Sequence, residues 1–310
     1  MTDISPSELP EVRAEIIDWI NGPTAAQLWF KHTTLGSYDW LPFQASTDPA
    51  TYQSILRGTE ITRLREAELF YVAAEMVELV EVAAHSIPDF QLAPQDLPAP
   101  AGFMLFERPI AAMPAGDTEL GISAVSWAPM PGREHMLLAS TYLDRAEAAP
   151  FFDRAAPNRQ VGNNEPKLVY AHGGEFGWAF GDNEGHAPEA THFMATLAPR
   201  LKAAWLLMQQ PVTDLSNVSV PRPARRRLQR AGHEPSPVRL IQLRRPPSPR
   251  DAESSAAAQE YRHRWIVRGH WRQQWYPSRQ VHRPVWIEPH VKGPSDAPLL
   301  SGDKVHVWKR

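Results

Sequence analysis

The sequence predicts an α+β protein with an acidic N-terminal domain of mixed helices and strands, residues 1–215, and a small basic, β-rich domain, residues 216–310. Helical periodicity dominates the first 88 residues, and short apolar runs bounded by Gly and Pro follow. Charge also divides the chain: residues 221–310 hold 19 Lys and Arg against 7 Asp and Glu, whereas residues 1–220 hold 13 against 28. This asymmetry favours a basic part that faces a polyanion and an acidic part with another partner. The alternative is that the two halves neutralise each other across an internal interface.

Three helices are expected. Ser5 as N-cap, Pro6 at the first helical position and Glu8 closing a capping box predict the start of the first helix, which ends at Gly22-Pro23. A longer helix is expected over residues 61–88, which are rich in Ala, Leu and Glu. A third is expected over 189–209, with a kink at Pro199.

Strands are expected at "GFMLFERPI" (102–110), "GISAVSWAPM" (121–130) and "HMLLASTYLD" (135–144). Residues 167–182 predict two strands joined by a turn at Gly173-Gly174. Residues 220–237 form a basic connector with helix at Ala224–Ala231, and 238–245 form a strand. Residues 246–260 predict a loop, and the last 50 residues are β-rich.

Several classes of protein are disfavoured. The absence of cysteine excludes disulfides and thiolate zinc sites, and there is neither a signal peptide nor an apolar run of membrane-spanning length. A cytoplasmic protein without membrane contact is therefore expected. No cofactor is expected, because the chain lacks a phosphate loop, a dinucleotide fingerprint and a G-x-S-x-G elbow. No metal is expected either, because no known ligand spacing fits the cluster formed by His172, Glu175, Asp182, Glu184 and His186.

The stretch "YRHRWIVRGHWRQQWYP", Tyr261–Pro277, combines four arginines with two histidines and three tryptophans. A strand over 261–271 would place its aromatic residues on one face, in a core, and its arginines on the other. Arginine binds phosphate bidentately and stacks on bases, so the outer face is expected to bind nucleic acid. The alternative is a charged edge strand that is merely solvated. The expected nucleic-acid-binding residues are Arg225, Arg226, Arg227, Arg262, Arg264, Arg268, Arg272 and Lys292, supported by Trp265, Trp271 and Trp286.

His270 and His290 are candidate catalytic residues. One imidazole can take a proton from a 2′-hydroxyl and the other can protonate the leaving oxygen, as metal-independent RNA cleavage requires. The alternative is that both histidines hydrogen-bond structural carbonyls, so enzymatic activity stays open.

The segments "VRGHWRQQWYP" (267–277) and "HRPVWIEPHVKGP" (282–294) resemble the C-terminal signature of a family of phage- and plasmid-encoded proteins that includes a type V-A anti-CRISPR protein. The matching residues are Arg268, His270, Trp271, Trp286 and His290. Residues 100–110 and 218–232 are also similar to that family. The resemblance implies recognition of a nascent polypeptide on the ribosome and loss of the encoding mRNA, and so antagonism of host defence.

The sequence as a whole favours an RNA- or ribosome-associated regulator encoded by a mobile element, whose acidic domain recognises a protein or nascent peptide. Two alternatives stay open. One is a metal-independent ribonuclease or toxin that uses His270 and His290. The other is a non-enzymatic structural or interaction protein.

Overall fold

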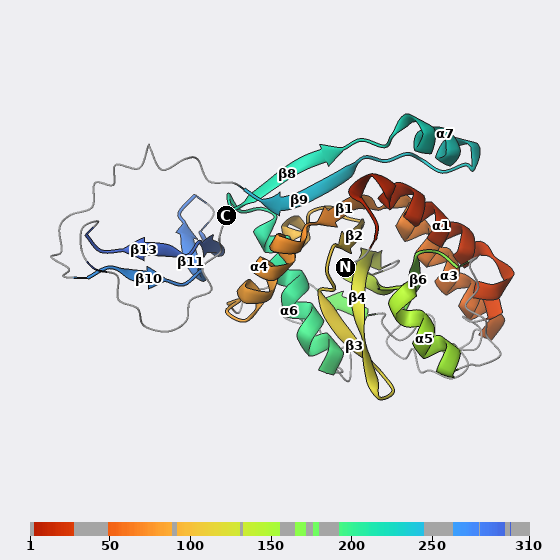
Figure 1. Cartoon of the computed structure of the whole chain (residues 1–310), viewed down its shortest axis with the longest axis horizontal. Coiled ribbons are helices and arrows are strands. Elements are labelled where there is room, and N and C mark those ends of the chain that lie inside the picture. The colour runs from red at the N-terminus through yellow and green to blue at the C-terminus, as the bar shows by residue number, and fades with distance from the viewer. Residues whose placement is uncertain are drawn as a thin grey trace.

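The computed structural model describes residues 3–27, 49–88, 92–130, 133–155, 165–171, 176–179, 192–244, 263–278, 280–294 and 298. The expected α+β class is confirmed: helices pack on a large mixed sheet, and two small antiparallel ladders follow it in the chain (Figure 1). No helix in these ranges is long and apolar enough to cross a membrane.

The first helix begins as the sequence predicts. A 3-10 turn, Pro6–Glu8, leads into α1, Leu9–Asn21. The Ser5 backbone N–H and hydroxyl donate to Glu8 Oε2 at 2.8 and 2.7 Å, and these bonds lower the pKa of Glu8 to about 2. At the other end Arg57 Nε donates to Ile20 O at 2.9 Å, so a side chain satisfies a terminal carbonyl before Gly22.

The single helix expected over 61–88 is wrong. The chain instead forms α3, Pro49–Glu66, then strand β1, Glu68–Val72, then α4, Ala74–Ala84. The strand pairs in parallel with β2, Gly102–Phe106, and with β9, Val238–Leu243. A parallel strand buried on both faces is a continuous apolar run without alternation, and periodicity cannot distinguish the "LFYV" run from a helix segment.

The large sheet has the order β6-β5-β4-β2-β1-β9-β8. The expected strands are confirmed as β2, β4 (Thr118–Met130) and β5 (Arg133–Asp144), and β3 (Ala111–Ala115) pairs with β4. The two strands expected over 167–182 are confirmed as β6 (Leu168–Tyr170) and β7 (Phe176–Ala179), and both pair with β5. The Gly173-Gly174 turn lies outside the described residues, as do the histidines and carboxylates of the cluster at 172–186.

Helices cover both faces of this sheet (Figure 1). Alternate residues of β1 enter opposite cores: Phe70 packs with α4 and with α6, His192–Leu207, whereas Tyr71 packs with α1 and α3. Trp127 lies at the centre of the first core, 5.8 Å from Phe70 and 5.3 Å from Trp205 between ring centroids. A Cβ on Gly102 would lie 2.2 Å from the Trp127 ring, so only glycine fits beneath it.

The first part of the basic segment belongs to the large sheet. Strand β8, Thr213–Val218, spans the boundary expected between residues 215 and 216, and β9 follows in the same sheet. Between them the expected basic helix is confirmed as α7, Arg222–Arg230. The two small ladders pair β10 (Trp265–Val267) with β13 (His290–Lys292) and β11 (His270–Tyr276) with β12 (Val281–Ile287). Two short elements complete the fold, η2 (Pro94–Asp96) and α5 (Arg145–Ala155).

Candidate functional site

The two small ladders belong to one long hairpin, residues 265–292, which we call the C-terminal hairpin. Trp265 pairs with Lys292 and Tyr276 pairs with Val281, and every pair between them keeps the same register. The expected strand over 261–271 is therefore wrong in extent, because it breaks at Arg268-Gly269 and continues to Tyr276. At this point Pro289 of the facing segment has no N–H to donate to a ladder, and only glycine fits at position 269, because a Cβ there would lie 2.5 Å from the Trp286 ring.

Two tryptophans attach the C-terminal hairpin to the rest of the protein. Trp286 is 5 % exposed and belongs to the core that contains Trp127. Trp271 packs edge-to-face on it, 5.3 Å between ring centroids, and donates its Nε1–H to Ala83 O of α4 at 2.9 Å. The expectation that Trp265 and Trp271 are largely buried is wrong, because both are only partly buried. These residues sit on two-stranded ladders, which cover less surface than a full sheet.

Polar contacts strengthen this attachment. Arg283 of β12 forms an ion pair with Asp96 Oδ1, and the Asp96 side chain is 1 % exposed. The other Asp96 oxygen accepts the Ala93 N–H at 2.8 Å. Gln210, which follows α6, accepts the Trp286 N–H at 3.4 Å and donates to Pro284 O at 3.5 Å. The C-terminal hairpin therefore has a defined orientation on the helices and large sheet that precede it in the chain, which we call the body.

The opposite side of the C-terminal hairpin is basic and exposed. His270 and Arg272 flank Trp271 and are exposed, as the expected alternation requires, and Arg268 at the strand break is exposed too. Farther along β11, Tyr276 is 37 % exposed and lies by alternation on the side of His270 and Arg272, whereas Trp275 is 43 % exposed and lies on the side of Trp271. Lys292 is exposed and Arg264 is partly buried, whereas Arg262 lies outside the described residues.

The remaining arginines of the expected set lie elsewhere. Figure 1 shows α7 and the C-terminal hairpin at opposite ends of the molecule, so the eight expected residues do not form one surface. Helix α7 packs on α1 through Ala224 and Leu228. Arg225 and Arg226 are exposed, but Arg227 binds both carboxylate oxygens of Glu11 at 2.8 and 3.0 Å, and these bonds raise its pKa.

Several ion pairs join the acidic and basic halves of the chain. Besides Arg227–Glu11 and Arg283–Asp96, Arg239 lies 2.6 Å from Glu68. A hydrogen bond of 2.9 Å also joins His233 Nε2 to Asp18 Oδ1. The alternative of internal neutralisation is therefore correct for these residues. It does not extend to Arg268 and Arg272, which make no ion pair with any described acidic residue.

The two candidate catalytic histidines bond to their own strands. His270 Nδ1 lies 3.0 Å from Arg268 O, and His290 Nδ1 lies 2.9 Å from Glu288 O. A carbonyl only accepts, so Nδ1 carries the hydrogen in each ring, and Nε2 is the basic nitrogen of the neutral form. His290 pairs with Val267, three residues before His270, so the two histidines flank the strand break. These bonds agree with the structural alternative, and catalysis stays a prediction.

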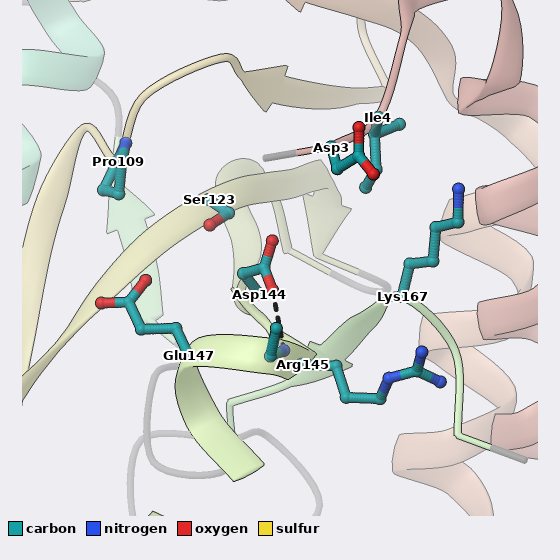
Figure 2. Close-up of a pocket in the computed structure, with 9 residues that line it drawn as sticks. Asp3, Ile4, Pro109, Ser123, Asp144, Arg145, Glu147 and Lys167 are labelled. Atoms are coloured by element: carbon teal, nitrogen blue, oxygen red, sulfur yellow. Dashed lines mark hydrogen bonds between the residues drawn. The ribbon is translucent and has the colours of Figure 1, made fainter. Parts of the chain in front are cut away.

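A second site was not predicted from the sequence. A cavity of about 400 Å³ lies between β4, the start of α5 and the N-terminal residues (Figure 2). We call it the acidic cavity, because three carboxylates line it. Its lining residues are Asp3, Ile4, Pro109, Ser123, Asp144, Arg145, Ala146, Glu147 and Lys167.

A β-bulge places Ser123 in this cavity. Ile122 pairs with Leu143 and Ala124 with Tyr142, so Ser123 is the extra residue between two consecutive pairs. Its side chain is 0 % exposed, and its hydroxyl has no hydrogen-bond partner among the described residues. Leaving such a group unpaired costs about 1–3 kcal/mol. Bulges that re-aim a side chain are over-represented beside functional sites, and no sequence pattern announces this one.

Backbone groups hold the two central carboxylates of the acidic cavity. Glu147 Oε1 accepts the Gly121 N–H at 3.0 Å, and a Cβ on Gly121 would lie 2.7 Å from Pro109. Asp144 Oδ1 accepts the Ala146 N–H at 2.8 Å and so caps α5. The two cationic side chains of the lining bond to other residues. Lys167 Nζ lies 3.1 Å from Glu8 Oε1, and Arg145 donates to the backbone carbonyl of Glu165.

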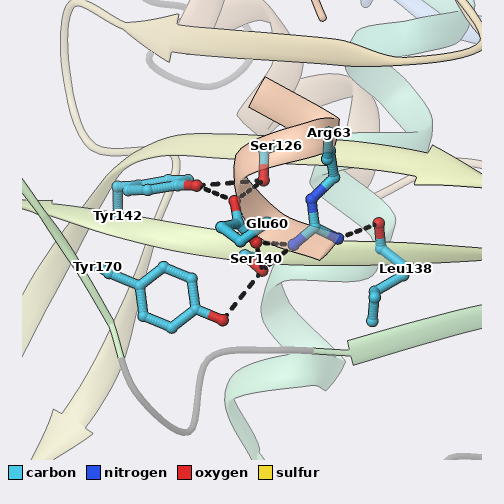
Figure 3. A network of polar contacts seen from close by, with 7 residues as sticks. All are labelled: Glu60, Arg63, Ser126, Leu138, Ser140, Tyr142 and Tyr170. Atoms are coloured by element: carbon cyan, nitrogen blue, oxygen red, sulfur yellow. Dashed lines mark hydrogen bonds and ion pairs between the residues drawn. The ribbon is translucent and has the colours of Figure 1, made fainter. Parts of the chain in front are cut away.

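A buried polar network lies under α3 (Figure 3). Glu60 and Arg63 are 1 % and 4 % exposed and form an ion pair. Ser126, Ser140 and Tyr142 donate to the Glu60 carboxylate, and Arg63 donates to Leu138 O at 2.8 Å. These four partners lie on β4 or β5, so the network fixes α3 on the sheet.

The fold and these sites define an α+β protein whose mixed sheet carries an anchored basic hairpin. No protein-family model and no curated protein matches the chain. Among solved structures it is weakly similar to the crystal structure of AcrVA2, at 12 % sequence identity and a TM-score of 0.38, over 88 % of this chain and 96 % of that one.

Proposed function

We propose that this protein binds RNA through the exposed side of the C-terminal hairpin. The observation that carries the proposal is the exposed trio Arg268, His270 and Arg272, on strands whose other side is fixed to the body by Trp271 and Trp286. A fixed backbone holds guanidinium groups ready for phosphate, which lowers the ordering cost of binding.

Exposed aromatic rings extend the same element. Trp275 and Tyr276 lie near the turn of the C-terminal hairpin, and Trp275 packs on His282 with ring centroids 4.8 Å apart. Unpaired bases stack on such rings, whereas bases within a duplex already stack on each other. By alternation Tyr276 lies on the side of Arg272, and this combination of arginines and an aromatic ring favours single-stranded RNA.

The wider role that we propose is regulation of a message. The body carries most of the acidic residues, which repel nucleic acid and favour a protein or nascent-peptide target. The resemblance of residues 267–294 to the type V-A anti-CRISPR family supports a mobile-element protein that associates with RNA or ribosomes and promotes loss of the mRNA of its target.

Charge reversal tests the RNA proposal. We expect the double variant Arg268→Glu/Arg272→Glu of the full chain to lose measurable binding to a fluorescent single-stranded RNA, because two phosphate contacts become repulsive. The matched control is Arg225→Glu/Arg226→Glu on α7, with the same charge change at the other end of the molecule. Equal loss in both variants would mean that net charge, and not the C-terminal hairpin, determines binding.

A second candidate function is metal-independent cleavage of the bound RNA. The bond from each Nδ1 to a carbonyl fits a structural role, but it also leaves Nε2 of His270 and His290 as the basic nitrogen, and this observation favours cleavage. Cleavage in excess chelator should then fall about 10²–10⁴-fold in His270→Ala and in His290→Ala, with a bell-shaped pH profile in the wild type. Intact RNA with the wild-type protein would contradict catalysis and leave both histidines as structural residues.

A further inference from the structure

The buried hydroxyl of Ser123 indicates that the acidic cavity binds a polar ligand. This side chain is fully buried, lies on a bulge, and has no partner in the part of the chain that the structure describes. Figure 2 shows the hydroxyl on the side of the cavity where Asp144 and Glu147 lie. A group that reaches this hydroxyl must carry a hydrogen-bonding atom, because an apolar group would leave it unpaired.

The charges around the cavity indicate which polar group this is. Asp144 and Glu147 each use one carboxylate oxygen on a backbone N–H, and their second oxygens contact no donor among the described residues. Asp3 adds a third carboxylate. Lys167 is paired with Glu8, and Arg145 donates to the backbone carbonyl of Glu165. The three carboxylates therefore outnumber the one lining cation that is not paired with a described carboxylate, so the cavity favours a cation.

The arrangement fits an organic cation better than a metal ion. Among the described residues no three carboxylates or histidines lie close enough together to hold a metal. Ile4 and Pro109 line the same cavity and can pack an alkyl chain while its charged end meets the carboxylates. A volume of about 400 Å³ is within the usual range for a small-molecule or side-chain site.

We propose that the acidic cavity binds an alkylammonium or alkylguanidinium group, which donates to Ser123, Asp144 and Glu147. The group is either a free amine or the side chain of a lysine or arginine in a bound polypeptide. This site lies on the body and is independent of RNA binding by the C-terminal hairpin.

The test is a titration of the full chain with small probe molecules, monitored through the amide chemical shifts of Gly121 and Ala146. The probes are n-butylammonium, n-butylguanidinium and the uncharged n-butanol. We expect saturable shifts with at least one cation and none with n-butanol. Affinity should fall about tenfold in Glu147→Gln, the equivalent of one charge-assisted hydrogen bond. The matched control is Glu119→Gln, an exposed residue of β4 that does not line the cavity.

Ser123→Ala separates a ligand role from a structural one. Because the hydroxyl has no described partner, its removal should leave the thermal midpoint unchanged or raised while cation affinity falls. A lowered midpoint with unchanged affinity would overturn the assignment, as would absence of saturable shifts with both cations or an equal response to n-butanol.

A peptide distinguishes the two sources of the cation. The probe is acetyl-Gly-Gly-Lys-Gly-Gly-amide, compared with its norleucine analogue. Binding of the lysine peptide much tighter than n-butylammonium would assign the site to a polypeptide side chain. Equal or weaker binding of the peptide would assign it to a free amine, and tight binding of the norleucine peptide would overturn the cation site.

Discussion

At the scale of single residues, the contribution of a polar side chain to stability depends on its burial and its partners rather than on residue type. Glu60, Asp96 and Ser123 are polar and fully buried, yet only the first two have partners among the described side chains. A buried charge with its partners is tolerated, because hydrogen bonds offset the loss of hydration. None of the three was identified from the sequence, since burial of one polar residue depends on contacts distant along the chain.

Removal of the Glu60 carboxylate should be strongly destabilising. Glu60→Ala leaves the Arg63 guanidinium buried without its counter-charge, so we expect a loss of about 3–5 kcal/mol in the free energy of unfolding, measured with urea. Glu66→Ala, at the exposed end of the same helix, should change stability by less than about 0.5 kcal/mol. Similar losses in both variants would contradict the role given to the network.

At the scale of elements, local signals predicted ends and turns better than interiors. The capping box at Ser5 and Glu8, the stop at Gly22 and the basic helix α7 are all confirmed, because each depends on neighbouring residues. Strand β1 was missed because its burial on both faces depends on β2 and β9. The alternation in the C-terminal hairpin was correct around Trp271, but the need for glycine at position 269 depends on the Trp286 ring of the facing strand.

The same limit applies to the candidate sites. The basic trio Arg268, His270 and Arg272 could be predicted, since period-2 alternation places it opposite Trp271. The separation of α7 from the C-terminal hairpin could not, because it depends on the path of β8 and β9 through the large sheet. The acidic cavity could not be predicted either, because a bulge leaves no mark in one sequence.

The C-terminal hairpin should contain one aromatic residue that stabilises the protein and another that contacts RNA. Trp286→Ala should cost about 3–5 kcal/mol in unfolding free energy, because it empties a buried position. Tyr276→Ala, on the side of Arg272, should leave the thermal midpoint nearly unchanged and weaken RNA binding by about 1–3 kcal/mol, the value of one stacked base. A large loss of stability in Tyr276→Ala, without loss of RNA binding, would contradict the stacking role.

At the scale of the whole molecule, the structure separates two basic regions that the composition alone does not distinguish. Among the described basic residues of the last ninety positions, Arg227 and His233 contact acidic residues of α1 at one end of the molecule, whereas Arg268 and Arg272 are exposed at the other. A net charge of −3 therefore conceals a partly neutralised basic region and an exposed one. The exposed region is the proposed contact for RNA.

The salt dependence of RNA affinity tests that claim most directly. For single-stranded nucleic acid, the logarithm of affinity falls with the logarithm of salt concentration with a slope of about −0.7 for each phosphate contact. We predict that Arg268→Ala/Arg272→Ala reduces the magnitude of the wild-type slope by about 1.4, the value of two contacts, whereas Arg225→Ala/Arg226→Ala leaves it unchanged. A wild-type affinity that does not vary with salt, or a slope reduced only by the α7 variant, would contradict the assignment of RNA binding to the C-terminal hairpin.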